Sequence, residues 1–269
     1  MVKKLYKHEF LAWLRVVPII FCITLLSAGF HRILQLFETD SVYYRIVSGS
    51  LLVVFSVALL ATLAAPVIFG IVRFYKNLFT GEGYLTFTLP VKTTTHLLVK
   101  TTTNLVFCIA AFLVCIASFC LITAGDVFAE ICKAAAYIWK DIPQKYVGHT
   151  AAFIAEFLTF LLLATIASTL LFDACLCVGQ LAKKNRILLA VGAYFIYYIA
   201  TQIIGTVLVV GATVLELAGK LQPIYDYIQK NPLPSVHIGF AIASTFYILL
   251  SAIFWFISRG ILRKKLNLE

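Results

Sequence analysis

Hydrophobic positions along the chain gather in six long runs that short polar segments separate. The second run, residues 46–72, and the third run, residues 101–125, contain no charged side chain. A hydrocarbon core about 30 Å thick needs about 20 apolar helical residues to cross it, whereas barrel strands would show segments of alternating polarity. The pattern therefore predicts an all-α polytopic membrane protein with six transmembrane helices, over residues 16–37, 46–72, 101–125, 151–182, 187–215 and 236–258.

The residues before the first run predict an amphipathic helix over 1–15. Apolar side chains recur there at helical spacing, and most of the charged ones, Glu9 among them, fall elsewhere on the helix surface. This distribution is typical of a helix that lies in the membrane interface. We therefore divide the chain into this interfacial helix, with Trp13 at headgroup level, and a transmembrane domain over 16–269.

Composition and charge support this organisation and set its orientation. Hydrophobic residues make up 62% of the chain and charged residues 13%, whereas a soluble domain is roughly 45–50% apolar. Most of the 22 Lys and Arg residues precede the first run, follow the sixth, or lie between the second and third or the fourth and fifth runs. Positive residues concentrate on the cytoplasmic side, so we expect both termini in the cytoplasm. No separate basic domain remains, and we expect no nucleic-acid partner.

The fourth run carries the two acidic residues that need explaining in hydrocarbon, Glu156 and Asp173. We place Glu156 near the outer boundary, at headgroup level. Asp173 lies roughly 10 Å from the inner end of the same helix at 1.5 Å per residue. It either forms a polar lining or interhelical pair, or reaches the inner headgroups or Lys183. The two acids are about 25 Å apart along the helix and do not form a catalytic pair.

Motifs for catalysis and metal binding are missing from the sequence. It contains no nucleophile motif, no HExxH, no metal-spaced set of His and Cys, and no GxxxxGK[ST] phosphate loop. His31 and His237 stand alone at span ends, where we interpret them as interfacial side chains. We therefore expect no catalytic residue, no metal site and no ATP hydrolysis in this chain.

One polar segment is too elaborate for a simple connection between spans. The stretch RFYKNLFTGEGYLTFTLPVK, residues 73–92, belongs to a predicted cytoplasmic loop over 73–100. Gly81, Glu82 and Gly83 permit a sharp turn, and Pro90 favours an extended approach to the third span. Because the loop faces the cytoplasm, a soluble partner can reach it.

Four stretches of the sequence resemble a known family: LYKHEF, FYKNLFTGEGYLTFTLPV, VGQLAKKNRIL and ILRKKLNLE. The family is the membrane subunits of ABC transporters of the second, exporter-like permease type, in the form common among Gram-positive bacteria. The resemblance covers essentially the whole chain. It implies a multi-pass subunit of the bacterial cell membrane that pairs with a second membrane subunit, the same or a related chain, and with cytoplasmic ABC ATPase subunits. ATP and Mg are then expected in the partner ATPase, and no cofactor in this chain.

The same resemblance implies that the loop over 73–100 is the coupling element that docks on the ATPase. Aromatic side chains would anchor it in a groove of the partner, while charged side chains would set the register. The alternative is that the aromatics sit in the lipid interface. The docking residues expected on this basis are Arg73, Phe74, Tyr75, Lys76, Phe79, Gly81, Glu82, Gly83, Tyr84, Phe87 and Pro90.

The sequence thus favours a permease subunit of an ATP-driven exporter for a hydrophobic or amphipathic cargo, peptide or lipid-like. Three other readings stay open. They are a self-contained secondary transporter or channel, a non-transporting sensor or immunity partner in an ABC assembly, and an intramembrane enzyme acting on lipids. The missing nucleophile and metal motifs disfavour the last of these.

Overall fold

The computed structural model describes residues 2–80, 83, 88, 91–141, 147–182 and 184–264. Within these ranges the chain forms helices and no strand. Six helical segments are long and apolar enough to cross a membrane. The predicted all-helical protein with six long apolar helices is confirmed, while the cytoplasmic termini and the interfacial position of the first helix stay predictions.

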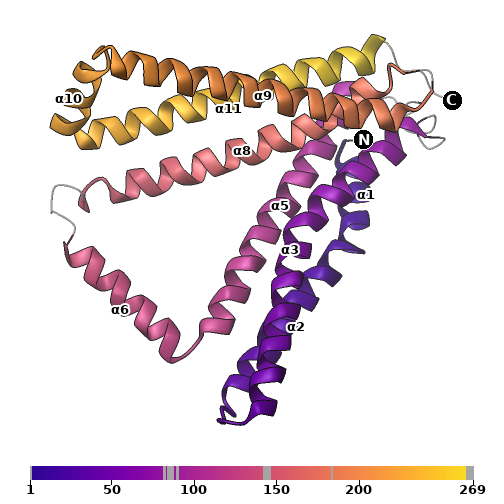
Figure 1. Cartoon of the computed structure of the whole chain (residues 1–269). Helices are drawn as coiled ribbons and strands as arrows, with labels where there is room; N and C mark the ends of the chain where they lie inside the picture. The colour runs from indigo at the N-terminus through magenta and orange to yellow at the C-terminus, as the bar shows by residue number, and fades with distance from the viewer. Residues whose placement is uncertain are drawn as a thin grey trace. The chain divides into compact units, whose positions relative to one another are not determined.

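The chain divides into two compact units, and the first spans Met1–Pro143. In this unit α2, α3 and α5 pack against one another, and α1 packs along α5 and α2. Helix α6 leads away from the end of α5 (Figure 1). The helices of the first unit are α1 (Val2–Leu14), α2 (Val17–Gln35), α3 (Val42–Phe79), α5 (Thr93–Thr123) and α6 (Asp126–Asp141).

The helices extend beyond the apolar runs that predicted them. Helix α3 continues to Phe79 and α5 begins at Thr93, so both ends of the predicted loop over 73–100 are helical. Polarity marks where a chain leaves hydrocarbon, but a helix ends only where a residue breaks it. No glycine or proline interrupts residues 71–79, and the helix therefore runs on past the apolar run.

Polar contacts and close approaches hold the three spanning helices of the first unit together. The hydroxyls of Thr24 on α2 and Thr62 on α3 are 2.5 Å apart, and Thr24 also donates to the carbonyl of Ala58. Between α3 and α5, a methyl group added at Gly70 would lie 2.7 Å from the amide nitrogen of Asn104. A side chain larger than glycine at position 70 would require the Asn104 amide to move.

The second unit spans Gln144–Glu269 and is built around α8. Helix α8 packs against both α11 and α9 (Figure 1). Its apolar core joins Leu170, Leu171, Ala174 and Cys175 of α8 to Phe254 of α11. The helices of this unit are α8 (Thr150–Gly179), α9 (Arg186–Leu217), α10 (Gln222–Lys230) and α11 (Pro232–Lys264).

The stretch VGQLAKKNRIL forms the tight connection between α8 and α9. A methyl group added at Gly179 would lie 2.6 Å from the carbonyl oxygen of Arg186 and 2.8 Å from Cβ of Ala190. Asn185, just before α9, adopts the left-handed conformation with φ 60° and ψ 48°, which asparagine tolerates better than most residues. Glycine and asparagine therefore let the two helices approach closely at this end.

Candidate functional site

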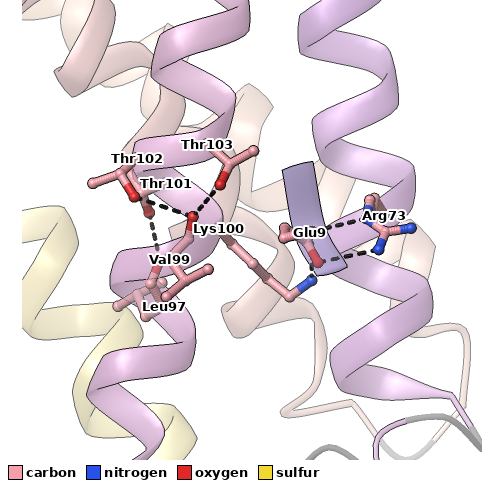
Figure 2. A network of polar contacts seen from close by, with 8 residues as sticks. All are labelled: Glu9, Arg73, Leu97, Val99, Lys100, Thr101, Thr102 and Thr103. Carbon is pink, nitrogen blue, oxygen red and sulfur yellow. Dashed lines mark hydrogen bonds and ion pairs between the residues drawn. The ribbon is translucent and has the colours of Figure 1, made fainter. Parts of the chain in front are cut away.

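The main polar site of the first unit is a carboxylate held between two cations (Figure 2). Glu9 on α1 is 6% exposed. Arg73 on α3 donates from Nε to Oε1 at 2.8 Å and from Nη2 to Oε2 at 3.1 Å. Lys100 on α5 donates from Nζ to Oε1 at 3.2 Å. One side chain of α1 is thus bonded to two other helices, and we call these three residues the Glu9 cluster.

Helix α1 presents Glu9 to its partners because neighbouring turns of the same face are also packed. One turn before Glu9, the hydroxyl of Tyr6 lies 2.9 Å from that of Thr102 on α5. One turn after it, the buried indole of Trp13 stacks on Phe107 with ring centroids 4.9 Å apart. Residues about four apart share a helix face, so these contacts fix the rotation of α1.

The threonines that follow Lys100 turn their hydroxyls back onto α5. Thr101 donates to the carbonyl of Leu97 at 3.0 Å, and Thr103 donates to that of Val99 at 2.8 Å (Figure 2). The hydroxyls of Thr101 and Thr103 thus donate within α5, while Thr102 meets Tyr6 and Lys100 reaches Glu9 on α1.

The electrostatics of the Glu9 cluster suit a tie between helices better than acid–base chemistry. A guanidinium that binds a carboxylate through two N–H groups fixes direction as well as distance, and arginine does not lose its proton in proteins. Removing one member of a buried ion pair leaves an uncompensated charge. The cluster therefore holds the end of α3 and the start of α5 on α1, on both sides of residues 80–92.

The structure separates the predicted docking residues by their exposure. Phe74 and Phe79 are buried and their rings are 5.8 Å apart, edge to face. Tyr75 is half-buried and Lys76 is exposed. Arg73 is engaged by Glu9, so in this structure it is not an unpaired cation for a partner.

Of the remaining members of that set, the structure describes Gly83. Gly83 is buried, and its backbone N–H donates to the carbonyl of Thr80 at 2.7 Å. The others lie outside the described residues, namely Gly81, Glu82, Tyr84, Phe87 and Pro90. Docking on an ATPase stays a prediction for the whole set.

In the second unit, Glu156 contacts a histidine of another helix. Its Oε1 lies 2.7 Å from Nδ1 of His237 on α11. Nε2 of the same ring lies 3.2 Å from Nδ1 of His149, the residue just before α8. Phe153 stacks on His237 with centroids 4.6 Å apart and planes inclined by 16°. His237 thus bonds two side chains in the α8 region, as expected for a satisfied histidine, and its position in the membrane interface stays a prediction.

Asp173 does not share this polar chain. It is 5% exposed, one turn before the buried Cys177 on α8. Both placements considered for Asp173, a polar lining or interhelical pair and a reach toward the inner headgroups or Lys183, stay predictions. Its role in a pathway stays a prediction.

Sequence reasoning missed the Glu9 cluster and the contact between Glu156 and His237, although the sequence contains a signal for each. Glu9 is the acidic residue among lysines before the first span, while Arg73 and Lys100 follow the second span and precede the third. Glu156 and His237 both lie in the second turn of their helices. When two helices cross a membrane in the same direction, residues in the same turn of each helix lie at the same depth.

The part of the chain that the structure describes offers no metal centre, since no three His, Cys, Asp or Glu side chains converge closely enough to hold an ion. No protein-family model, no curated protein and no solved structure matches this chain.

Proposed function

We propose that the chain is a membrane-spanning permease subunit of an ATP-driven ABC exporter in the bacterial cell membrane. It would form a translocation path with a second membrane subunit and couple to cytoplasmic ATPase subunits that bind ATP and Mg. Six long apolar helices and the four sequence stretches that resemble such permeases support this proposal. The cargo proposed from the apolar, aromatic-rich composition is hydrophobic or amphipathic, peptide or lipid-like.

The observation that carries the proposal is the Glu9 cluster. Residues 80–92 connect α3 to α5, and Glu9 bonds the end of one helix and the start of the other. A displacement of this connection by a partner would therefore pull on α1, α3 and α5 together. Packed helices change between discrete arrangements rather than deforming smoothly.

The proposed mechanism is alternating access driven from the partner. ATP binding draws two ATPase subunits together, the docked segment moves with them, and the attached helix ends shift so that the path opens outward. This chain supplies the attached helices, while bond cleavage in ATP occurs in the partner.

The test is co-purification with a soluble ATPase that carries GxxxxGK[ST] and is encoded beside this chain. We expect the ATPase to remain bound to the wild-type chain in detergent, and Lys76→Glu to reduce the bound fraction, since Lys76 is exposed at the end of α3. Lys133→Glu is the matched control, because Lys133 is an exposed lysine on α6. If no such ATPase binds, or if both variants bind it as the wild type does, the proposal is wrong.

A self-contained ion-coupled carrier is the second candidate, because Asp173 is buried on α8 and an intramembrane acid is often functional. Purified protein in liposomes distinguishes the two. Uptake driven by an ion gradient alone, without any ATPase, would favour the carrier.

A further inference from the structure

Three side chains at the start of α8 and α11 form a continuous hydrogen-bonded chain. His149 is exposed, and its Nδ1 lies 3.2 Å from Nε2 of His237. The other nitrogen of that ring, Nδ1, lies 2.7 Å from Oε1 of Glu156. The chain thus leads from a surface imidazole, through a partly buried one, to a carboxylate.

The far end of the chain is an incompletely satisfied carboxylate. Within the described residues, Oε2 of Glu156 is buried and has no hydrogen-bond partner. A buried polar atom without a partner costs free energy, and the cost is greater when the group is charged. Protonation of Glu156 would remove that charge.

We propose that His149, His237 and Glu156 form a proton-binding relay that loads Glu156 from water. A proton bound at Nδ1 of His149 passes to Nε2 of His237, while the proton on Nδ1 of His237 passes to Oε1 of Glu156. No other bond forms or breaks. Both rings end neutral, Glu156 becomes a carboxylic acid, and the reverse transfers release the proton to water.

The geometry keeps the central ring in place for both transfers. His237 is held by a hydrogen bond at each nitrogen and by Phe153, which stacks on its face with planes 16° apart. Neither transfer requires the ring to turn, because donors and acceptors already lie within hydrogen-bond distance. Histidine is suited to this role because its two nitrogens can donate and accept at once.

Other ionisable side chains on adjoining elements stand apart from the relay. Glu216 ends α9, and α10 carries Asp226 and Lys230. Within the residues that the structure describes, none of these forms an ion pair or a hydrogen bond with the three relay groups. The relay therefore exchanges protons among its own members and with water.

Loading changes the charge at the contact between α8 and α11. The relay needs only the second unit, so it does not depend on an ATPase partner. The relay lies where α8 and α11 begin. The compartment that faces this end of the two helices therefore sets the protonation of the relay.

The test is time-resolved infrared spectroscopy of the full chain in nanodiscs after an acid jump. We expect a protonated-carboxyl C=O band to rise, to be lost in Glu156→Gln, and to remain in Asp173→Asn, the control for the other acid of α8. In His237→Phe, which keeps an aromatic ring beside Phe153, we expect loss of the fast phase of the band. His149→Gln should slow it as well.

The circular dichroism spectrum of each variant reports whether its helices are retained. If the band is unchanged in Glu156→Gln, the acid is not the loading group. If it rises as fast in a folded His237→Phe as in the wild type, the proton reaches Glu156 by another route. Either result overturns the relay.

Discussion

Each unit of the protein shields a carboxylate, but the partners of the two carboxylates differ in kind. Glu9 in the first unit meets a guanidinium and an ammonium group, whereas Glu156 in the second meets imidazoles in series. Arginine keeps its charge at any physiological pH. Histidine changes charge near neutrality.

The two contacts therefore differ in what they can do. The first contact stays charged over the physiological pH range, so it can transmit a displacement between helices. The second can gain or lose a proton without breaking, so it can respond to the medium. The two carboxylates also differ in exposure, since Glu9 is buried and the side chain of Glu156 is 33% exposed.

The largest effect is expected from Glu9→Gln. Gln is nearly isosteric but neutral, so Lys100 and Arg73 lose their counter-charge in a shielded site. Breaking such a pair costs about 3–5 kcal/mol, with the lower end more appropriate because Arg73 is partly exposed. The measurement is the free energy of unfolding in mixed micelles titrated with SDS.

Glu130→Gln provides the control, because Glu130 is exposed on α6. A neutralising substitution in the Glu9→Gln background, Lys100→Met, should recover part of the loss. Equal stability of Glu9→Gln and Glu130→Gln would show that the first contact is no stronger than a surface charge.

A smaller effect is expected from His237→Phe in the second unit. The substitution keeps an aromatic ring against Phe153 but removes the hydrogen bond to Glu156. Leaving a partly buried carboxylate without its partner costs about 1–3 kcal/mol. His8→Phe on the exposed face of α1 is the comparison, and a loss as large as that of Glu9→Gln would erase the distinction between the two units.

The smallest effect is expected from Thr62→Val, which removes an uncharged tie of the first unit. Thr62 is fully buried, and its hydroxyl contacts that of Thr24. Hydrogen bonds between membrane helices average about 0.6 kcal/mol. Thr206→Val on α9, where the hydroxyl bonds only its own helix, should change the unfolding free energy less.

The apolar runs of the sequence predicted the six long helices because their length and uniform polarity are local properties. Helix ends were less predictable. Residues 73–79 are polar enough to leave hydrocarbon, yet they lack a helix breaker and continue α3. A hydropathy pattern does not distinguish a polar helix end from a loop.

The polar contacts could not be predicted from the sequence, for a different reason. Glu9 is 64 residues from Arg73 and 91 from Lys100, and Glu156 is 81 from His237. Such pairs depend on how helices rotate and which of them become neighbours. Trp13 illustrates the same limit, because its apolar character was evident but its stacking on Phe107 depends on α5. Its depth in a bilayer stays a prediction.

The position of Glu9 within α1 also decides how the start of the polypeptide can be engineered. Residues 2–4 are exposed, so an affinity tag or fluorescent fusion joined ahead of them should leave assembly intact. Progressive deletion should be tolerated until it removes Tyr6, and should become damaging once it passes Glu9. Tolerance to truncation would then change abruptly within a single helical turn.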